Sequence, residues 1–216
     1  MKITAVMPVF NEEKTLLSVL NVINNTEVIN EIIVVDDASS DNSRKKINSI
    51  KSNKITIISL KKNLGKSDAV KVAVQSTKTD ILLFCDADLI NLSEEHINQI
   101  VRPLIDGKLL MSVGLRDYGL IGNYIYKNYL PLIAGERAIP YSIFKETMNN
   151  PFMKDYALEV VLNDYCKKNS IPIYKNTMKG LKQTVKHKKW KNGAYLLAKE
   201  MFQILMVIVM LKIKRY

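Results

Sequence analysis

The sequence predicts an α/β fold in which helices flank a mainly parallel central sheet. Three features indicate it. Short apolar runs rich in β-branched residues recur through the first half of the chain, longer stretches with helical periodicity separate them, and polar residues follow most of the runs. Parallel strands need long crossover connections, usually helices, so this alternation is typical of βαβ units. The predicted strands span residues 3–9, 31–36, 55–60, 81–85 and 109–113.

Apolar residues at helical spacing predict the helices that lie between and after these strands. They indicate helices near residues 16–23, 70–74 and 97–104, and Ser93 followed by two glutamates is typical of the start of the third. Beyond Gly114, glycines and prolines interrupt Tyr-rich segments, which favours loops and short helices that cover a site. The last predicted elements are a helix over residues 157–167, a short strand over 171–174 and a long basic and apolar helix over 194–216.

The overall composition is that of an ordinary globular protein. A chain of 216 residues with 47% hydrophobic and 25% charged residues can bury one sizeable core. Because Met1 and Lys2 run straight into the first predicted strand, no targeting segment is visible, and a cytoplasmic location is expected. Cys85 and Cys166 lie far apart without metal-ligand spacing, so two buried reduced thiols are expected.

The positive charge is concentrated near the C-terminal end. The chain has a net charge of +11, and residues 175–216 carry +10 because eleven Lys and Arg residues there face one acid, Glu200. Residues 201–211 contain one polar side chain, Gln203, and are too few to span a bilayer, which takes about 20 apolar residues. The pattern favours either a helix in the headgroup region of an anionic membrane or a helix that packs on the core or on a second copy of the chain. Nucleic acid is not an expected partner, because nothing resembles a recognised reading module.

Polar residues cluster where the predicted strands end. Open parallel sheets bind ligands outside the carboxyl ends of their strands. Three of the four tips are acidic, and the other sets Gly65 beside Lys66. Carboxylates hold hard divalent cations, so the layout favours a nucleotide diphosphate bound with such a cation. Taken singly, each tip is also compatible with a helix cap, a turn or a solvated loop. The tips are residues 8–13, 36–41, 63–66 and 86–88.

The same blocks, in this order and spacing, resemble the family 2 glycosyltransferases. The matching segments are residues 7–13 (MPVFNEE), 34–41 (VVDDASSD), 63–66 (NLGK) and 86–89 (DADL). The likeness covers about residues 3–115, and it is nearest to polyprenyl-phosphate sugar transferases and to enzymes of the glucosyl-phosphoglycerate synthase type. It implies a GT-A fold over residues 1–193, with a nucleotide-sugar-binding half over 1–114 and an acceptor half over 115–193, followed by the helix over 194–216.

The resemblance implies roles for residues of these blocks. It places Asp88 on a divalent metal, Mn²⁺ or Mg²⁺, and Asp86 on the metal, on a metal-bound water or on the ribose. Lys66 would meet the diphosphate, and Asp37 would accept a hydrogen bond from the base with the assistance of Asp36. The implied wall around base and ribose consists of Pro8, Phe10 and Glu12.

Weaker likenesses extend into the second half. Residues 132–138 resemble the acceptor-side loop of the family, and residues 156–160 resemble the following helix, whose glutamate points toward the donor sugar or the acceptor. Glu159 is therefore the first candidate for a catalytic base or a sugar-orienting carboxylate, with Glu136 and Asp155 as alternatives. Each of the three is also compatible with an ordinary surface acid.

His187 is a further candidate for the metal site. Some members of the fold use a late histidine as a metal ligand, and imidazole suits manganese-like ions. Its position in the lysine run 186–189 is also typical of an exposed side chain.

The sequence thus predicts a metal-dependent glycosyltransferase. It would move a hexose from a UDP- or GDP-linked sugar to an acceptor, with a lipid phosphate or a membrane glycolipid suggested by the basic tail, at the inner face of the membrane. The alternatives are a non-catalytic nucleotide-sugar-binding or scaffold protein of a membrane complex, and a sugar nucleotidylyltransferase. The second is disfavoured because residues 10–13 lack the glycine-rich loop typical of such enzymes. A homo-oligomer built through the last helix is left open.

Overall fold

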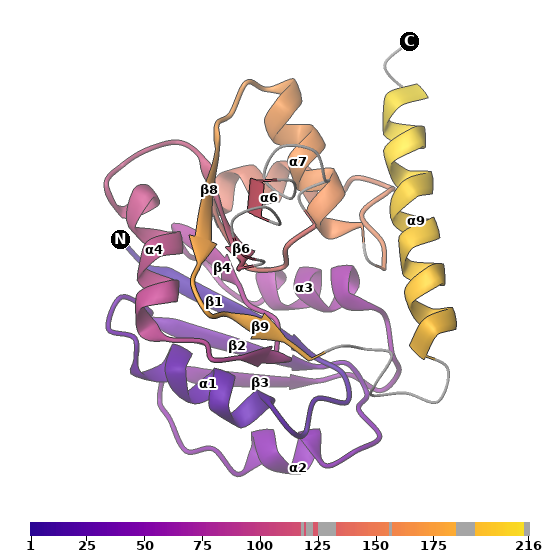
Figure 1. Cartoon of the computed structure of the whole chain (residues 1–216). Helices are drawn as coiled ribbons and strands as arrows, with labels where there is room; N and C mark the ends of the chain where they lie inside the picture. The colour runs from indigo at the N-terminus through magenta and orange to yellow at the C-terminus, as the bar shows by residue number, and fades with distance from the viewer. Residues whose placement is uncertain (118, 120–122, 125–132, 156, 185–192, 214–216) are drawn as a thin grey trace.

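The structure, a computed structural model of the whole chain, describes residues 1–117, 119, 123–124, 133–155, 157–184 and 193–213. Its strands are β1 (Ile3–Val9), β2 (Glu31–Asp36), β3 (Ile55–Ser59), β4 (Ile81–Phe84), β5 (Leu89–Ile90), β6 (Met111–Arg116), β7 (Arg137–Pro140), β8 (Ile173–Met178) and β9 (Lys182–Gln183). Within the described residues, one seven-stranded sheet has the order β3-β2-β1-β4-β7-β6-β8, and β5 and β9 form a separate ribbon (Figure 1).

The sheet is mainly parallel, as predicted. Among its described strands only β7 runs against its neighbours, pairing antiparallel with both β4 and β6. Strand β7 was not predicted, because it lies where glycines and prolines indicated loops. Strand β8 is longer than predicted, because it pairs residue by residue with the whole of β6, from Met111↔Ile173 to Arg116↔Met178.

Helices cover both faces of this sheet and enclose two apolar cores. The helices are α1 (Leu16–Asn25), α2 (Ser43–Asn48), α3 (Lys66–Gln75), α4 (Glu94–Ile105), α6 (Tyr141–Thr147), α7 (Leu158–Lys168) and α9 (Gly193–Ile213). Alternate residues of β1 face opposite cores: Met7 packs with α1 and α4, whereas Val6 packs with α3, α6 and α7. The predicted α/β class is therefore confirmed. Cys85 and Cys166 are buried free thiols, as expected.

Helix α9 packs against the outside of the domain beside α7 (Figure 1). One stripe of the helix, Ile204, Val207, Ile208 and Leu211, packs on the core that contains α3 and α7. Other large apolar side chains of α9 face outward, with Phe202 63% and Leu205 57% exposed. Over the described residues, no helix combines the length and apolar character needed to cross a bilayer. The contact of this stripe with the core agrees with the alternative that the last helix packs on the core. A second apolar face of α9 stays exposed. The predicted division of the chain at residue 193 stays a prediction.

Candidate active site

The candidate site lies where the strand order of the sheet reverses. From β1 the chain moves outward through β2 to β3, and it then returns to the other side of β1 as β4. Because β2, β1 and β4 are parallel, their carboxyl ends lie at one edge of the sheet. Open α/β sheets bind ligands at such a switch point. The predicted tips therefore share this edge.

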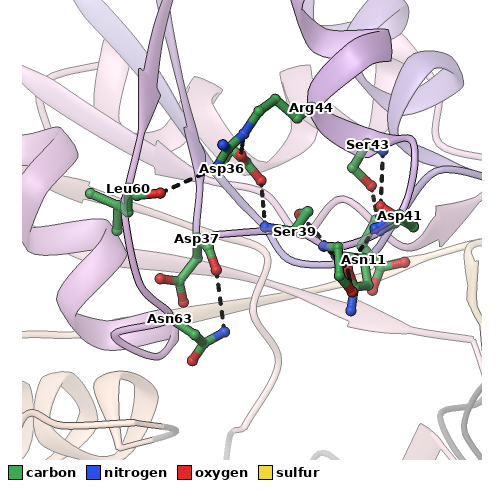
Figure 2. A network of polar contacts seen from close by, with 11 residues as sticks. Asn11, Asp36, Asp37, Ser39, Asp41, Ser43, Arg44, Leu60 and Asn63 are labelled. Carbon is green, nitrogen blue, oxygen red and sulfur yellow. Dashed lines mark hydrogen bonds and ion pairs between the residues drawn. The ribbon is translucent and has the colours of Figure 1, made fainter.

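The tips of β1 and β2 are joined by hydrogen bonds between side chains and backbone (Figure 2). Asn11 adopts the left-handed conformation (φ 57°), which asparagine tolerates better than most residues. Its Oδ1 accepts a hydrogen bond from Ser40 N at 2.8 Å, and Asn11 N donates to Ser39 Oγ at 3.1 Å. These contacts fix the loop that carries the predicted wall residues, which are all partly exposed: Pro8, Phe10 and Glu12.

The two aspartates after β2 have different partners. Asp36 is buried and accepts a 2.5 Å hydrogen bond from Arg44 Nε (Figure 2). Asp37 accepts one backbone hydrogen bond on each oxygen, from Leu64 N at 2.7 Å and from Gly65 N at 2.9 Å. Burial raises the pKa of Asp37, although both backbone bonds act in the opposite direction. Asp36 thus anchors α2, and Asp37 shapes the loop before α3. The predicted recognition of the base would use the second lone pair on the oxygens of Asp37.

The first turn of α3 is held by Asp155 from the second half of the chain. Ser67 donates to the carbonyl of Asp155 through its backbone N at 2.9 Å and through Oγ at 2.7 Å. Gly65 precedes the helix with φ 87°, and a Cβ there would lie 3.0 Å from Asp155 Oδ1. Both facts favour glycine at this position. Asp155, an alternative catalytic candidate, is exposed and contributes its carbonyl to this junction.

Lys66, Asp86 and Glu159 come together at the centre of the site. The Lys66 ammonium lies 2.7 Å from Asp86 Oδ1 and 2.7 Å from Glu159 Oε1. The three side chains come from the start of α3, the tip of β4 and the first turn of α7, and each is less than a fifth exposed. The two carboxylates raise the pKa of Lys66 despite its burial. The ammonium therefore stays protonated, and the cluster carries a formal charge of −1.

The loop before β7 approaches Asp86 closely at Gly135. A Cβ on Gly135 would lie 2.3 Å from Asp86 Oδ2, so any side chain would displace the carboxylate. In this structure the small residue makes room for the acidic tip of β4.

Arg137 is a buried positioning residue that sequence reasoning missed. Its guanidinium donates to the carbonyl of Ala134, to the carbonyl of Glu159 at 3.5 Å and to Asn163 Oδ1 at 3.2 Å. Burial lowers its pKa. Arg137 therefore ties the loop before β7 to the turn of α7 that carries Glu159. The available signal was a charged residue directly before the apolar pair Ala138 and Ile139.

Glu136 lies near this cluster and faces Arg116. Its side chain is 1% exposed, and its Oε2 lies 3.6 Å from Arg116 Nη2. Among the described residues, neither of its carboxylate oxygens accepts a hydrogen bond. Burial raises the pKa of Glu136 to about 7, with the nearby Asp86 adding to the effect and Arg116 opposing it. A buried carboxylate without hydrogen bonds is costly and is found most often at functional positions.

Asp88 is held by the ribbon of β5 and β9. Its Oδ1 accepts a 2.7 Å hydrogen bond from Gln183 Nε2, and its carbonyl accepts one from Thr184 N at 3.0 Å. The side chain of Asp88 is nearly fully buried. His187, the third predicted metal ligand, lies outside the described residues.

The donor set suits a hard divalent cation. Asp86 and Asp88 supply carboxylate oxygens two positions apart on one tip, and Mg²⁺ is commonly bound by one or two carboxylates together with substrate phosphates. Within the described part of the chain, no three acidic, histidine or cysteine side chains gather into a complete metal cage. The residues present therefore fit a cation that shares its coordination shell with a phosphate ligand.

Comparison with known proteins identifies relatives along much of the chain. The family described as Glycosyl transferase family 2 matches residues 4–182. The undecaprenyl-phosphate 4-deoxy-4-formamido-L-arabinose transferase of Proteus mirabilis is 36% identical over 101 residues, which are 44% of this chain and 31% of that protein. The glucosyl-3-phosphoglycerate synthase of Mycobacterium tuberculosis is 32% identical over 115 residues, which are 49% of this chain and 35% of that protein. The matched part is thus about a third of the length of these relatives.

Solved structures share the fold. A crystal structure of the M. tuberculosis glucosyl-3-phosphoglycerate synthase with Mn²⁺, UDP and glucosyl-3-phosphoglycerate has a TM-score of 0.79 at 20% identity, and the match covers 97% of this chain and 79% of that chain. A structure of the same enzyme with Mg²⁺ and UDP has a TM-score of 0.78. The predicted GT-A fold is confirmed by this likeness. Because the family match extends over most of the chain and includes all four motif blocks, the chain belongs to glycosyl transferase family 2.

Proposed function

We propose that the protein transfers a hexose from a UDP- or GDP-linked sugar to an acceptor with the help of Mn²⁺ or Mg²⁺. The observation that carries the proposal is the arrangement of Lys66 between Asp86 and Glu159, with Asp88 two residues beyond Asp86. A protonated lysine among carboxylates, at the carboxyl edge of a parallel sheet, suits a ligand that brings both phosphate charge and a metal ion. The M. tuberculosis relative binds UDP together with Mn²⁺ or Mg²⁺ in its crystal structures.

Each part of the cluster has a defined task in this proposal. Asp86 and Asp88 hold the cation, and Lys66 donates hydrogen bonds to the diphosphate. When bound, the cation neutralises the negative charge that develops on the leaving nucleoside diphosphate. Glu159 orients the donor sugar or accepts the proton of the acceptor, because it lies against Lys66 in the first turn of α7. Glu136 is the second candidate for the base.

The base and ribose of the donor occupy the tips of β1 and β2. Pro8, Phe10 and Glu12 form the wall, and Asp37 accepts a hydrogen bond from the base. The hydrogen bonds around Asn11 (Figure 2) and those to the carboxylate of Asp37 support this assignment, because they fix these loops before the ligand arrives. The ion pair of Asp36 with Arg44 gives Asp36 the assisting role of fixing α2.

The acceptor belongs to a membrane in this proposal, either as a lipid phosphate or as a glycolipid. Helix α9 supports it, because Phe202, Leu205 and other apolar side chains are exposed beside basic residues at both ends of the helix. Such a helix lies in the headgroup region of anionic lipids, and the enzyme would then act peripherally at the inner face of the membrane. The P. mirabilis relative is itself an undecaprenyl-phosphate sugar transferase. A phosphate acceptor is already anionic and needs no strong base.

A screen of nucleotide sugars tests the proposal. The thermal midpoint is measured with UDP, GDP and their sugars, each with and without Mn²⁺ or Mg²⁺, since a ligand at 100 times its dissociation constant adds about 2.7 kcal/mol of stability. Release of UDP or GDP from the stabilising donor is then followed with and without lipid acceptors. Binding without any turnover would identify a non-catalytic nucleotide-sugar-binding protein. Formation of a nucleotide sugar from a nucleoside triphosphate would instead identify a nucleotidylyltransferase.

A further inference from the structure

Asp88 is connected to a distant part of the chain through a contact that the proposed chemistry does not by itself require. Gln183 lies 95 positions further along the sequence and donates from Nε2 to Asp88 Oδ1 at 2.7 Å. An ionised carboxylate can only accept hydrogen bonds, so the amide nitrogen of Gln183, and not its oxygen, must face Asp88. The contact therefore has a defined direction.

The backbone around this contact is fixed on both sides. Strand β5 begins immediately after Asp88 and pairs antiparallel with β9, with Leu89 opposite Gln183 and Ile90 opposite Lys182. The next residue, Thr184, donates its backbone N–H to the carbonyl of Asp88 at 3.0 Å and brings its hydroxyl to 3.3 Å from the same oxygen. The ribbon thus holds the backbone of Asp88 without the help of the Gln183 side chain, which acts only on the carboxylate.

We propose that Gln183 is a positioning residue of the metal site, which orients the carboxylate of Asp88 toward the cation through its side-chain amide. The inference rests on the proposed function, because it needs Asp88 to be a ligand. Partners that hydrogen-bond to ligating carboxylates fix the direction of the ligand, and their loss commonly lowers metal affinity 10- to 100-fold. A neutral amide suits this task, since it donates to Asp88 without adding a positive charge that would repel the cation. Because Asp88 is almost completely buried, water cannot easily take the place of the Gln183 amide as a hydrogen-bond donor to its carboxylate.

The test compares Mn²⁺ affinity in Gln183→Met with that in the wild-type protein. Free Mn²⁺ is measured by electron paramagnetic resonance during titration in the presence of saturating UDP, and UDP affinity is measured separately without metal. Gln183→Met keeps the length of the side chain and removes the donor, so the dissociation constant for Mn²⁺ should rise about 10-fold or more. UDP affinity without metal and the thermal midpoint without metal should stay close to wild type.

Thr184→Val is the matched control. It removes the hydroxyl contact at 3.3 Å and keeps the backbone N–H that bonds to Asp88, so its Mn²⁺ affinity should change less than twofold. Gln183→Ser provides a second removal of the amide if the methionine variant does not fold.

Two results would overturn the inference while leaving the proposed function intact. One is a wild-type affinity for Mn²⁺ in both Gln183 variants. The other is an equal loss of metal-free UDP affinity and Mn²⁺ affinity, which would make Gln183 an anchor of the whole site. If the wild-type protein binds no Mn²⁺ with either UDP or GDP, the proposed metal site fails, and the role of Gln183 fails with it.

Discussion

The two sides of the candidate site hold their charged side chains in different ways. The proposed nucleotide side consists of the tips of β1 and β2, and the proposed acceptor side consists of β7 and the start of α7. On the nucleotide side, Asp36 and Asp37 are satisfied by short bonds to Arg44 and to two backbone N–H groups. On the acceptor side, Glu136 is buried opposite Arg116 at 3.6 Å and accepts no hydrogen bond from the described residues.

The difference separates acids that stabilise the fold from an acid that is a candidate for a catalytic role. Acids that each hold two backbone groups or a guanidinium contribute to the fold whether or not a ligand is present. A buried acid that lacks such bonds costs stability, and proteins keep such groups chiefly where a function needs them. The Lys66, Asp86 and Glu159 cluster lies between the two sides. Substitutions on the two sides and in the cluster should therefore differ in the size and the kind of their effects.

Removal of the Asp88 carboxylate should have the largest effect. In Asp88→Ala the transfer rate should fall by roughly 100-fold or more, because a hard-cation site loses a ligand that contributes several kcal/mol of charge stabilisation at the leaving group. The measurement is release of nucleoside diphosphate with saturating Mn²⁺. Asp106→Ala is the control, since Asp106 is exposed and follows the C-terminal end of α4. Full activity of Asp88→Ala in the presence of chelator would refute the metal assignment.

Loss of Lys66 should lower the stability of the fold as well as the activity. In Lys66→Met the carboxylates of Asp86 and Glu159 lose the ammonium between them, and breaking a buried pair costs about 3–5 kcal/mol. Urea unfolding without ligand measures it. Lys168→Met is the matched control, because its pair with Asp164 has a similar length of 2.8 Å but the lysine is 40% exposed. Such exposed helix pairs contribute about 0.5 kcal/mol or less. Equal losses in the two variants would mean that the cluster is no more than a surface ion pair.

Glu136 should make stability depend on pH. Its pKa rises from 4.5 to about 7 on folding, so the folded state binds the extra proton between these values. The unfolding free energy should therefore fall as pH rises from about 4.5 to 7, by about 3 kcal/mol from this group. Arg116, Asp86 and Lys66 are the charged groups that act on it.

Glu136→Gln isolates this effect, because the amide does not titrate and has almost the same shape. The difference in unfolding free energy between wild type and Glu136→Gln should change by about 3 kcal/mol between pH 4.5 and pH 7.5, with wild type relatively more stable at the lower pH. Other acids titrate in both proteins and cancel in the difference. A difference that is constant with pH would place Glu136 among the satisfied acids of the nucleotide side.

Asp37 should affect affinity more than rate. In Asp37→Ala, the N–H groups of Leu64 and Gly65 lose their acceptor, which should cost about 1–3 kcal/mol of stability. If Asp37 also binds the base, the donor KM should rise while kcat at saturation stays comparatively intact. Steady-state kinetics with a stability measurement at the same temperature separate the two effects. An unchanged KM with lowered stability would leave Asp37 a framework residue and move recognition of the base to Glu12.

The sequence predicted the location of the strand tips well for a physical reason. Strand tips of a parallel sheet must meet at one edge, so the motif residues Asp37, Lys66 and Asp86 could be placed from their position in the chain alone. The residues that hold these tips in place could not be predicted in this way. The bond from Gln183 to Asp88 and the bonds of Arg137 to α7 depend on an antiparallel strand and a ribbon whose pairing no local pattern encodes.

The acceptor side was predicted less completely for the same reason. Glu159 was chosen by resemblance, and the structure sets it against Lys66, but its catalytic role stays a prediction. Glu136 and Arg116 meet only because β7 returns between β4 and β6, and β7 was not predicted. Long-range pairing of short strands is where sequence periodicity carries least information.

The smallest expected effects concern the exposed apolar face of α9, which has no partner among the described residues. Phe202 and Leu205 are 63% and 57% exposed, while Ile208 and Leu211 on another side of the helix pack on the core. If α9 lies on an anionic membrane, Phe202→Ser and Leu205→Ser should each weaken binding to vesicles that contain anionic lipid by roughly 1–2 kcal/mol. Neither change should alter unfolding by more than about 0.5 kcal/mol, because both side chains already face water.

The charge at the end of α9 supplies the matched comparison. Lys212→Gln should weaken the same binding by about 1 kcal/mol and reduce its dependence on salt, whereas the two serine variants should leave the salt dependence unchanged. Vesicle sedimentation at two salt concentrations measures both. Analytical ultracentrifugation at the same protein concentrations measures whether two copies of the chain associate through this face instead. If the wild-type protein ignores anionic vesicles, and Phe202→Ser splits a dimer instead, the exposed face of α9 is an interface between two copies, and the lipid acceptor loses its main structural support.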